Sequence, residues 1–291
     1  MALLAVDAAA GPAVGPALPI GRRRTFRPAV YLAALYLLLM LAWAVVPSAF
    51  TSESPFATHI ESPIQGPSLD HWFGTDASGR DIYTRVVFGA ASSLAIGVGA
   101  TALALLAAIG LGFAAGLGGR FTDGAISRFI EVVLAVPGLL IALLFIAMFG
   151  PGVVTQIIAV AVGSAVGYAR MVRGQVLAVK DSGYVKAAVA LGHAPRRIIS
   201  RHVFPNAVRP LVAVGTLGVG QSIVWASSLS FLGLGVAPPA PEWGAMLDAG
   251  RDFVSTAWWL ELFPGLAIVG CTLAVTVLGR YLQQRLEGRL A

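Results

Sequence analysis

Five long stretches without a charged side chain are the feature that most constrains how this chain can fold. They hold 18 to 38 residues each and lie between Arg27 and Glu53, Arg85 and Arg120, Glu131 and Arg170, Arg209 and Glu242, and Glu261 and Arg280. A membrane-spanning helix needs about 20 mostly apolar residues, because a charge in the middle of a bilayer is unfavourable. Charged residues make up 12% of the chain, against about 25% in an ordinary soluble domain. The sequence therefore predicts an all-α integral membrane protein and excludes a soluble globular or disordered chain.

The longest of these stretches has 38 residues, which is too many for one span. Gly150-Pro151-Gly152 is a turn sequence in its middle, so we expect two helices joined by a tight turn there. The chain then has six transmembrane helices, predicted at residues 29–47, 90–117, 130–149, 153–170, 210–234 and 259–280.

The distribution of basic residues sets the orientation of these spans. With six spans both termini lie on one side of the membrane, and the segments on that side hold 17 of the 20 Lys and Arg residues. The other side holds Arg80, Arg85 and Arg251. The positive-inside rule then predicts that both termini are cytoplasmic. The net charge of +6 reflects this topology and needs no nucleic acid to explain it.

The chain divides into a short tail and one membrane domain. Residues 1–21 are rich in Ala, Pro and Gly and predict a disordered cytoplasmic tail. Residues 22–291 form the membrane domain, and we read its first span as an uncleaved signal anchor.

Motifs that would give the chain chemistry of its own are absent from the sequence. There is no Walker A motif for ATP binding, no His-Glu-x-x-His motif and no cysteine cluster for a metal. The four histidines all fall outside the predicted spans, and Cys271 is the only cysteine. We therefore expect no catalytic site, no metal site and no bound cofactor in this chain.

Residues 171–209 form the longest cytoplasmic segment and, with the Arg before them, carry eight basic residues and one acid. Residues 184–192 predict a short helix that ends in Gly192, and Pro195 opens a second helix over 196–203. One face of the first helix carries small apolar residues at helical spacing: Val185, Ala188, Val189 and Gly192. Such a pair of helices fits a groove on another protein, and a basic loop lying on anionic lipid is the alternative.

Three segments in order along the chain carry a resemblance to a known family. Ala187-Ala188, Gly192 and Pro205, thirteen residues after that Gly, resemble the EAA loop of ABC-importer permeases. HWFGTDASGRD at 71–81 resembles the segment before the second span of peptide/nickel-type permeases. LSFLGLG at 229–235, followed by PEWGAML at 241–247, resembles the signature after their fifth span. Over about residues 20–285 the chain resembles the C-type permease of dipeptide and oligopeptide importers.

This resemblance implies a type I ABC-importer permease (MetI-like) fold in a bacterial-type cell membrane. It implies the translocation-pathway subunit of an ATP-driven importer that moves di- or oligopeptides into the cytoplasm. The implied partners are a second homologous permease in a heterodimer, two ATP-binding subunits that hold ATP and Mg, and an extracytoplasmic solute-binding protein. The implied ATPase-coupling residues are Tyr184, Val185, Lys186, Ala187, Ala188, Leu191, Gly192 and Pro205.

The chain departs from the family pattern at three positions. The family usually has Glu where this chain has Lys186, commonly has Arg where Ala91 stands, and has an acid where Ala226 stands. Lys186 changes any polar contact that the usual Glu makes, but leaves the small residues of the loop in place.

Polar residues in the predicted fifth span are the candidates for lining a path for a peptide. They are Thr216, Gln221, Ser222, Ser227 and Ser228, and hydrogen bonding between helices is the alternative role for them. Arg128 and Glu131 are one turn apart and predict an ion pair, which we interpret as structural or as part of a gate region. We expect three tryptophans at the membrane interface: Trp243, Trp258 and Trp259.

A stand-alone carrier coupled to an ion gradient is the alternative function. Such a carrier of small solutes should have acidic residues inside its spans. Glu131 and Glu261 lie near span ends and no acid is central, so the sequence favours the importer subunit.

Overall fold

The computed structural model describes residues 27–286, so the predicted tail 1–21 lies outside the described residues. Over the described range the chain is helical, with one isolated bridge between Thr75 and Asp81 and no strand. Five helices are long and apolar enough to cross a membrane, and a bent pair of helices makes a sixth span if it is counted as one. The sequence-based prediction of an all-α membrane protein is confirmed.

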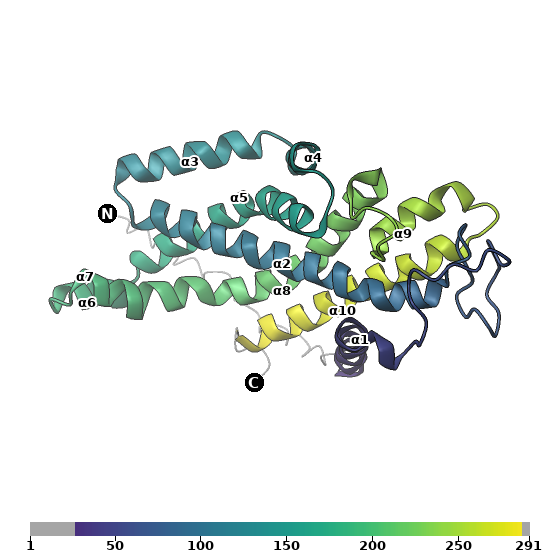
Figure 1. Ribbon diagram of the computed structural model, residues 1–291. Helices are drawn as coiled ribbons and strands as arrows, with labels where there is room; N and C mark the ends of the chain where they lie inside the picture. Colours follow the sequence, from purple (N-terminus) through teal and green to yellow (C-terminus); the bar gives the residue numbers. More distant parts are fainter. Residues whose placement is uncertain (1–26, 287–291) are drawn as a thin grey trace, which may run out of the picture.

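Ten α-helices build the described part of the chain (Figure 1). They are α1 (Arg27–Val45), α2 (Ile82–Leu117), α3 (Arg120–Leu134), α4 (Gly138–Phe149), α5 (Val153–Lys180), α6 (Gly183–Ala190), α7 (Pro195–Ile198), α8 (Phe204–Leu229), α9 (Trp243–Gly250) and α10 (Trp259–Leu286). Two π turns, Ile199–Val203 and Ser230–Leu234, flank α8, so that one helical rod begins at Pro195 and ends with a kink at Gly233, whose φ is +78°.

Helix α2 is the centre of the bundle and packs against α1, α5 and α8. Its contact with α5 depends on two glycines one turn apart. A β-carbon on Gly112 would lie 2.6 Å from Val172, and one on Gly116 would lie 2.6 Å from Val176. The two helices therefore approach more closely than larger side chains would allow, as small residues permit in membrane bundles.

The third predicted span, 130–149, is wrong as a single helix. The segment is split between α3 and α4, which are bent by 84° at a break of three residues. Pro137 causes the break, because a proline disfavours helical backbone in the residue before it and removes a backbone N–H. Helix α3 begins at Arg120, well before the predicted span, and carries most of the charged residues of this region.

Much of the predicted loop 171–209 is helix that continues the flanking spans. Helix α5 continues to Lys180, and the rod that contains α8 already begins at Pro195. The predicted helix over 196–203 is thus the first part of that rod rather than a separate element. Phe204 alone separates the π turn Ile199–Val203 from Pro205, which has no N–H for a regular helical turn.

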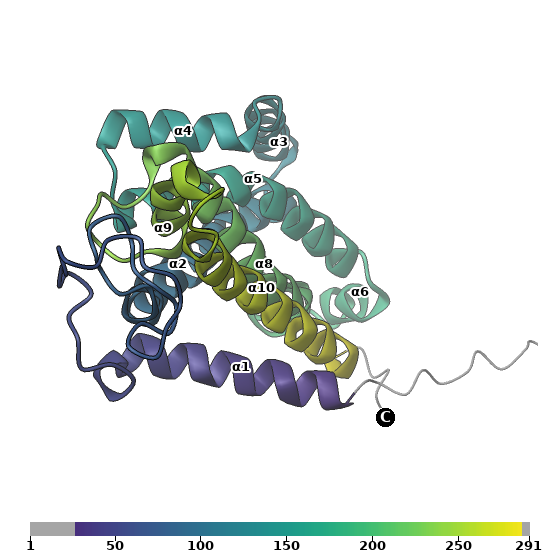
Figure 2. The ribbon, with the colours of Figure 1, turned by 90° about the vertical axis from the view of Figure 1, so that its right-hand side faces the viewer.

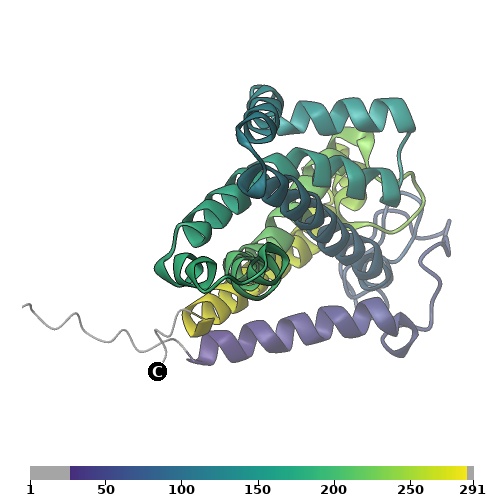
Figure 3. The same ribbon diagram turned by 90° about the vertical axis from the view of Figure 1, so that its left-hand side faces the viewer.

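The two ends of the bundle are distinct. The start of α1, the end of α10 and α6 lie on one side of the molecule, to the right in Figure 2 and to the left in Figure 3. The long segment 51–81 lies on the opposite side in both views. This arrangement agrees with the topology that the basic residues predict, with both ends of the membrane domain on the side of α6.

Candidate functional site

Helix α6 turns one apolar stripe toward its own chain. Val185 and Ala188 are buried and join a hydrophobic cluster with Val172 and Val176 of α5 and Ile198 of α7. The predicted docking face of Val185, Ala188, Val189 and Gly192 is therefore wrong as a single surface. An amphipathic helix outside the membrane buries its apolar stripe. Here the stripe of α6 packs against α5 and α7 of the same chain.

The opposite side of α6 is open. Tyr184 is 47% exposed and Leu191 is 75% exposed, and Ala187 and Lys186 are exposed beside them. Val189, at 59%, lies at the edge between the buried and open sides. Apolar side chains gathered on a surface that faces water mark a contact with another molecule.

Gly192 ends α6 through its backbone conformation. Its φ is +74°, a region that L side chains rarely adopt. The Gly192 N–H donates to the Val189 carbonyl at 2.9 Å, and the His193 N–H donates to the Ala188 carbonyl at 3.1 Å. These two bonds form the Schellman motif that closes many helices. A β-carbon on Gly192 would meet no atom of the described residues within 4 Å, so only the φ angle, and not this chain's packing, selects glycine here.

The five predicted polar residues of α8 do not share one face. Ser222 is buried and its Oγ lies 2.9 Å from Thr101 Oγ1 of α2, while Thr216 Oγ1 donates to the Ala213 carbonyl at 2.7 Å. Gln221 and Ser228 are exposed, and Ser227 is buried. Ser227 and Ser228 line a groove of about 410 Å³ between α8, α9 and α10. Ser222 and Thr216 thus bond within the bundle, whereas the exposed Gln221 and Ser228 belong to the open side of α8, and Ser227 lines the groove although it is buried.

Two ion pairs involve α3. Arg128 Nη1 lies 3.2 Å from Glu131 Oε2, and both side chains are exposed. Arg173 of α5 makes two bonds to Asp123, at 2.5 and 2.7 Å, which tie α3 to the bundle. Sequence reasoning missed this second pair because the two residues lie fifty positions apart.

The outer end is closed by buried polar residues. Glu242 is 1% exposed and accepts hydrogen bonds from the Gly244 and Ala245 N–H groups and from Ser93 Oγ. It therefore caps α9 and also ties α9 to α2. Sequence reasoning missed this role, because Ser, Thr, Asp and Asn are the usual N-cap residues and Glu is not among them.

Hydrogen bonds and ion pairs of polar side chains also anchor the segment 51–81. Asp76 binds Arg80 at 2.7 Å, and Arg85 Nη1 donates to the carbonyls of Pro55 and Pro239 at 3.1 Å. Asp81 caps α2 through the Thr84 N–H at 2.7 Å. These contacts fix the segment onto the start of α2.

Two tryptophans assigned to the membrane interface are core residues, which corrects that interpretation. Trp243 is fully buried and its Nε1 donates to the Val86 carbonyl at 2.9 Å. Trp259 is 7% exposed and its Nε1 donates to the Thr75 carbonyl at 3.2 Å. Trp258 is 52% exposed. Among residues 27–286, no three His, Cys, Asp or Glu side chains gather in a way that could hold a metal.

Residues 108–291 match the family model of the binding-protein-dependent transport system inner membrane component. The chain belongs to this family. The matched region runs from the last third of α2 through α6 and the α8 rod to residue 291, so it contains the open face described above. The permease is accordingly an inner membrane protein, as predicted.

Relatives match over most of the permease. The dipeptide transport system permease protein of Alkalihalophilus pseudofirmus is 40% identical over 247 residues, covering 85% of this chain and 81% of that protein. The glutathione transport system permease protein of Pectobacterium atrosepticum is 38% identical, covering 92% and 90%. A putative peptide transport system permease protein of Brucella suis is 37% identical, covering 98% and 94%.

Solved structures show the same fold. The MetNI methionine ABC transporter in inward-facing conformations has a chain with a TM-score of 0.59 at 16% identity, covering 69% of this chain and 96% of that one. An amino acid ABC transporter with histidines gives 0.54 at 20% identity, covering 71% and 95%. The fold is therefore that of an ABC-importer permease, as the sequence resemblance implied.

Proposed function

We propose that this permease lines the path of an ATP-driven importer that brings short peptides into the cytoplasm. The observation that carries the substrate class is the set of relatives that match over most of their length. They are named for dipeptide, peptide and glutathione transport at 37–40% identity. All three names refer to short peptides, so we take di- or oligopeptides as the substrates.

The open side of α8 is the proposed wall of the path. Ser227 and Ser228 lie in the groove between α8 and α10, whose other lining residues are almost all apolar, and Gln221 is exposed two turns before Ser228. An apolar wall with a few hydroxyl and amide groups can pass a peptide without holding it, because the peptide backbone finds donors and acceptors but no strong charge. Thr216 and Ser222, which bond inside the bundle, are assigned to helix packing instead.

The open side of α6 is the proposed contact with an ATP-binding subunit, which would hold the ATP and Mg. Tyr184, Lys186, Ala187, Leu191 and Gly192 form the surface that meets this partner. Val185 and Ala188 hold α6 on the bundle, and Pro205 lies in the rod that leads from α6 to the path. Movement of α6 would then reach the α8 rod through the short segment 191–194.

Two further partners complete the proposed importer. A second homologous permease would supply the other wall of the path, and an extracytoplasmic solute-binding protein would deliver the peptide to the outer end. No nucleic acid has a role. In this assembly the chain contributes no catalytic group, and hydrolysis belongs to the ATP-binding subunits.

Uptake of a labelled dipeptide into proteoliposomes that contain the purified complex tests this function. We expect uptake to require ATP and the solute-binding protein and to persist when an ionophore removes the ion gradients. Uptake that needs no ATP and stops with the ionophore would favour the ion-coupled secondary carrier instead.

A pair of substitutions at Gly192 tests the coupling segment. Asn tolerates a positive φ, whereas Ala does not, so Gly192→Asn adds a side chain to the surface and Gly192→Ala mainly strains the backbone. We expect Gly192→Asn to lower peptide uptake at unchanged thermal stability. Full uptake by this variant would contradict a contact at Gly192.

A further inference from the structure

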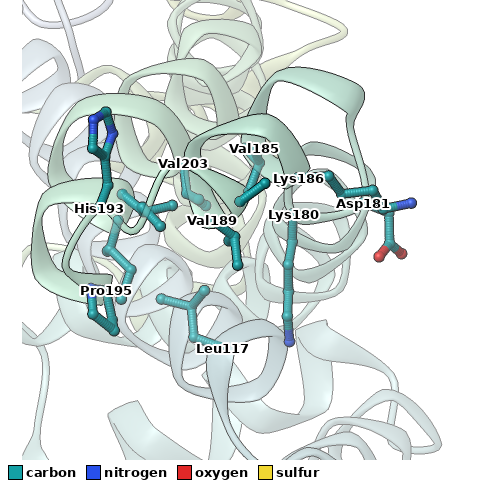
Figure 4. A pocket seen from close by; sticks show the side chains of 12 residues that line it. Leu117, Lys180, Asp181, Val185, Lys186, Val189, His193, Pro195 and Val203 are labelled. Atoms are coloured by element: carbon teal, nitrogen blue, oxygen red, sulfur yellow. The ribbon is translucent and has the colours of Figure 1, made fainter.

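A second apolar surface lies beside the open side of α6. A groove of about 680 Å³ opens between α6, α7, the π turn after α7 and the ends of α2 and α5 (Figure 4). Its apolar lining includes Leu117, Val185, Val189, Ile198, Ile199 and Val203. Figure 4 shows Leu117 across the groove from Val189, with the Lys180 side chain running along one side.

The groove leaves apolar side chains exposed. Val189 is 59% exposed and Ile199 is 37% exposed, and both lie outside the long apolar part of the spans. Residues 27–286 do not fill the space. Burial of such side chains contributes about 25 cal/mol for each Å² removed from water, so a partner with an apolar side chain of matching size would gain by entering.

The charges around the groove indicate what kind of partner fits. Lys180 and Lys186 stand at its rim, and the exposed Arg196 and Arg197 follow on α7. Asp181 is the one acid among the lining residues. The rim is thus positive, which favours an apolar side chain with carboxylates on either side of it.

A buried polar atom also lacks a partner here. His193 lines the groove, and its Nδ1 is buried without a hydrogen-bond partner among the described residues. A buried ring nitrogen without a partner is unfavourable, and a polar group that enters the groove would reach it only if the His193 ring turned.

We infer that this groove receives an apolar side chain, flanked by carboxylates, from the ATP-binding subunit. The inference rests on the proposed function, because it takes that subunit to be the protein that meets α6. The groove is continuous with the open side of α6 through Val189, so a protein that covers Leu191 would reach the groove without a gap. Docking is then reciprocal, with α6 entering the ATP-binding subunit and that subunit entering the groove.

Reciprocal docking would bring the partner into direct contact with the ends of two spans. Leu117 is the last residue of α2 and Lys180 is the last residue of α5, and Lys180 Nζ donates to the Gly116 carbonyl at 3.5 Å. A side chain seated in the groove would therefore press on the ends of two spans, besides moving α6.

Photo-crosslinking in the assembled complex tests the inference. A diazirine amino acid of about leucine size is placed at Leu117 in the groove, at Leu191 on the open side of α6, or at Leu106. Leu106 is 68% exposed on α2 and away from the groove, so it serves as the matched control. We expect crosslinks to the ATP-binding subunit from positions 117 and 191 and none from 106. Ile199 is a second position in the groove if the first variant does not assemble.

The outcomes separate this inference from the proposed function. Crosslinks from position 191 without any from 117 or 199 would overturn the groove and leave docking on α6 intact. The absence of crosslinks from all three positions would overturn both. A crosslink from 117 alone would support the groove and contradict the open side of α6 as the main contact.

A size change at Leu117 gives an independent measurement. Leu117→Trp should fill the groove and lower the amount of ATP-binding subunit recovered with the permease about tenfold. Leu117→Ala leaves the groove open and should lower recovery less, and Leu106→Trp should not change it. Equal recovery with Leu117→Trp and with the unchanged protein would overturn the inference.

Discussion

The outer and cytoplasmic ends of this permease are built in opposite ways. At the outer end, buried polar groups such as Glu242 and Trp259 find their partners within the chain. At the cytoplasmic end, apolar side chains such as Leu191 and Val189 are exposed, and a buried nitrogen of His193 has no partner among the described residues. Unpartnered buried atoms (Trp43 Nε1 and Glu261 Oε1) and exposed apolar side chains (Leu69) also occur at the outer end, so the ends differ in the buried hydrogen bonds of Glu242 and Trp259. Substitutions at the two ends should therefore affect different measurements.

The largest expected effect on stability is at Glu242. Glu242→Ala leaves the Gly244 and Ala245 N–H groups and the Ser93 hydroxyl without their acceptor. Loss of a buried, charged acceptor should lower the free energy of unfolding by about 3 kcal/mol. Thermal unfolding of the purified permease in detergent measures this.

Asp252→Ala is the control for this change, because Asp252 is an acid of the same end whose side chain is 81% exposed. It should leave the melting temperature almost unchanged. Equal melting temperatures for Glu242→Ala and Asp252→Ala would contradict the view that buried polar contacts hold the outer end.

At the cytoplasmic end the expected effect is on association. Leu191→Asp places a charge on the open side of α6 and should weaken binding of the ATP-binding subunit by about 2 kcal/mol, or about thirtyfold. The melting temperature of the isolated permease should not change, because Leu191 is 75% exposed. Leu69→Asp is the matched control, since Leu69 is 94% exposed at the outer end. If Leu191→Asp lowered the melting temperature but left binding of the ATP-binding subunit unchanged, the expected difference between the two ends would be contradicted.

A smaller effect on stability is expected at Trp259. Trp259→Phe keeps the aromatic ring in the core but removes the bond from Nε1 to the Thr75 carbonyl. The loss of one buried hydrogen bond should lower the free energy of unfolding by about 1 kcal/mol. Trp258→Phe changes the neighbouring, half-exposed ring and should have less effect. An equal effect of the two substitutions would show that the bond to Thr75 does not anchor the outer segment.

The sequence predicted the spans well where apolar length and charge decide the structure. It failed to predict whether a given apolar side chain is buried inside the protein or lies on its surface. Val185 and Leu191 are both apolar, and only the position of the α5 core determines that the first is buried and the second open. Trp243 and Trp259 could also satisfy their N–H groups at a membrane surface, so their burial could not be read from residue type.

The broken third span shows the same limit in the backbone. Pro137 lies in a long uncharged stretch, and inside a membrane neighbouring helices can support either a kinked helix or a break. Hydropathy is the same for both, so the bend of 84° between α3 and α4 could not be predicted. The motifs around Ala187, Gly192 and Pro205 point to the surface that we propose as the coupling site, because their order and spacing do not depend on which face is buried.

The smallest expected effect concerns the ion pair that the sequence did predict. Arg128 and Glu131 lie on one helix, with side chains that are 80% and 54% exposed. Such pairs contribute little, so Arg128→Gln should change the free energy of unfolding by less than about 0.5 kcal/mol. Arg173→Gln is the variant for comparison. Arg173 of α5 makes two bonds to Asp123 of α3, so its loss removes a link between two helices. Thermal unfolding of both variants should show the larger shift for Arg173→Gln. A larger shift for Arg128→Gln would contradict the view that an exposed ion pair within one helix contributes less than a pair that joins two helices.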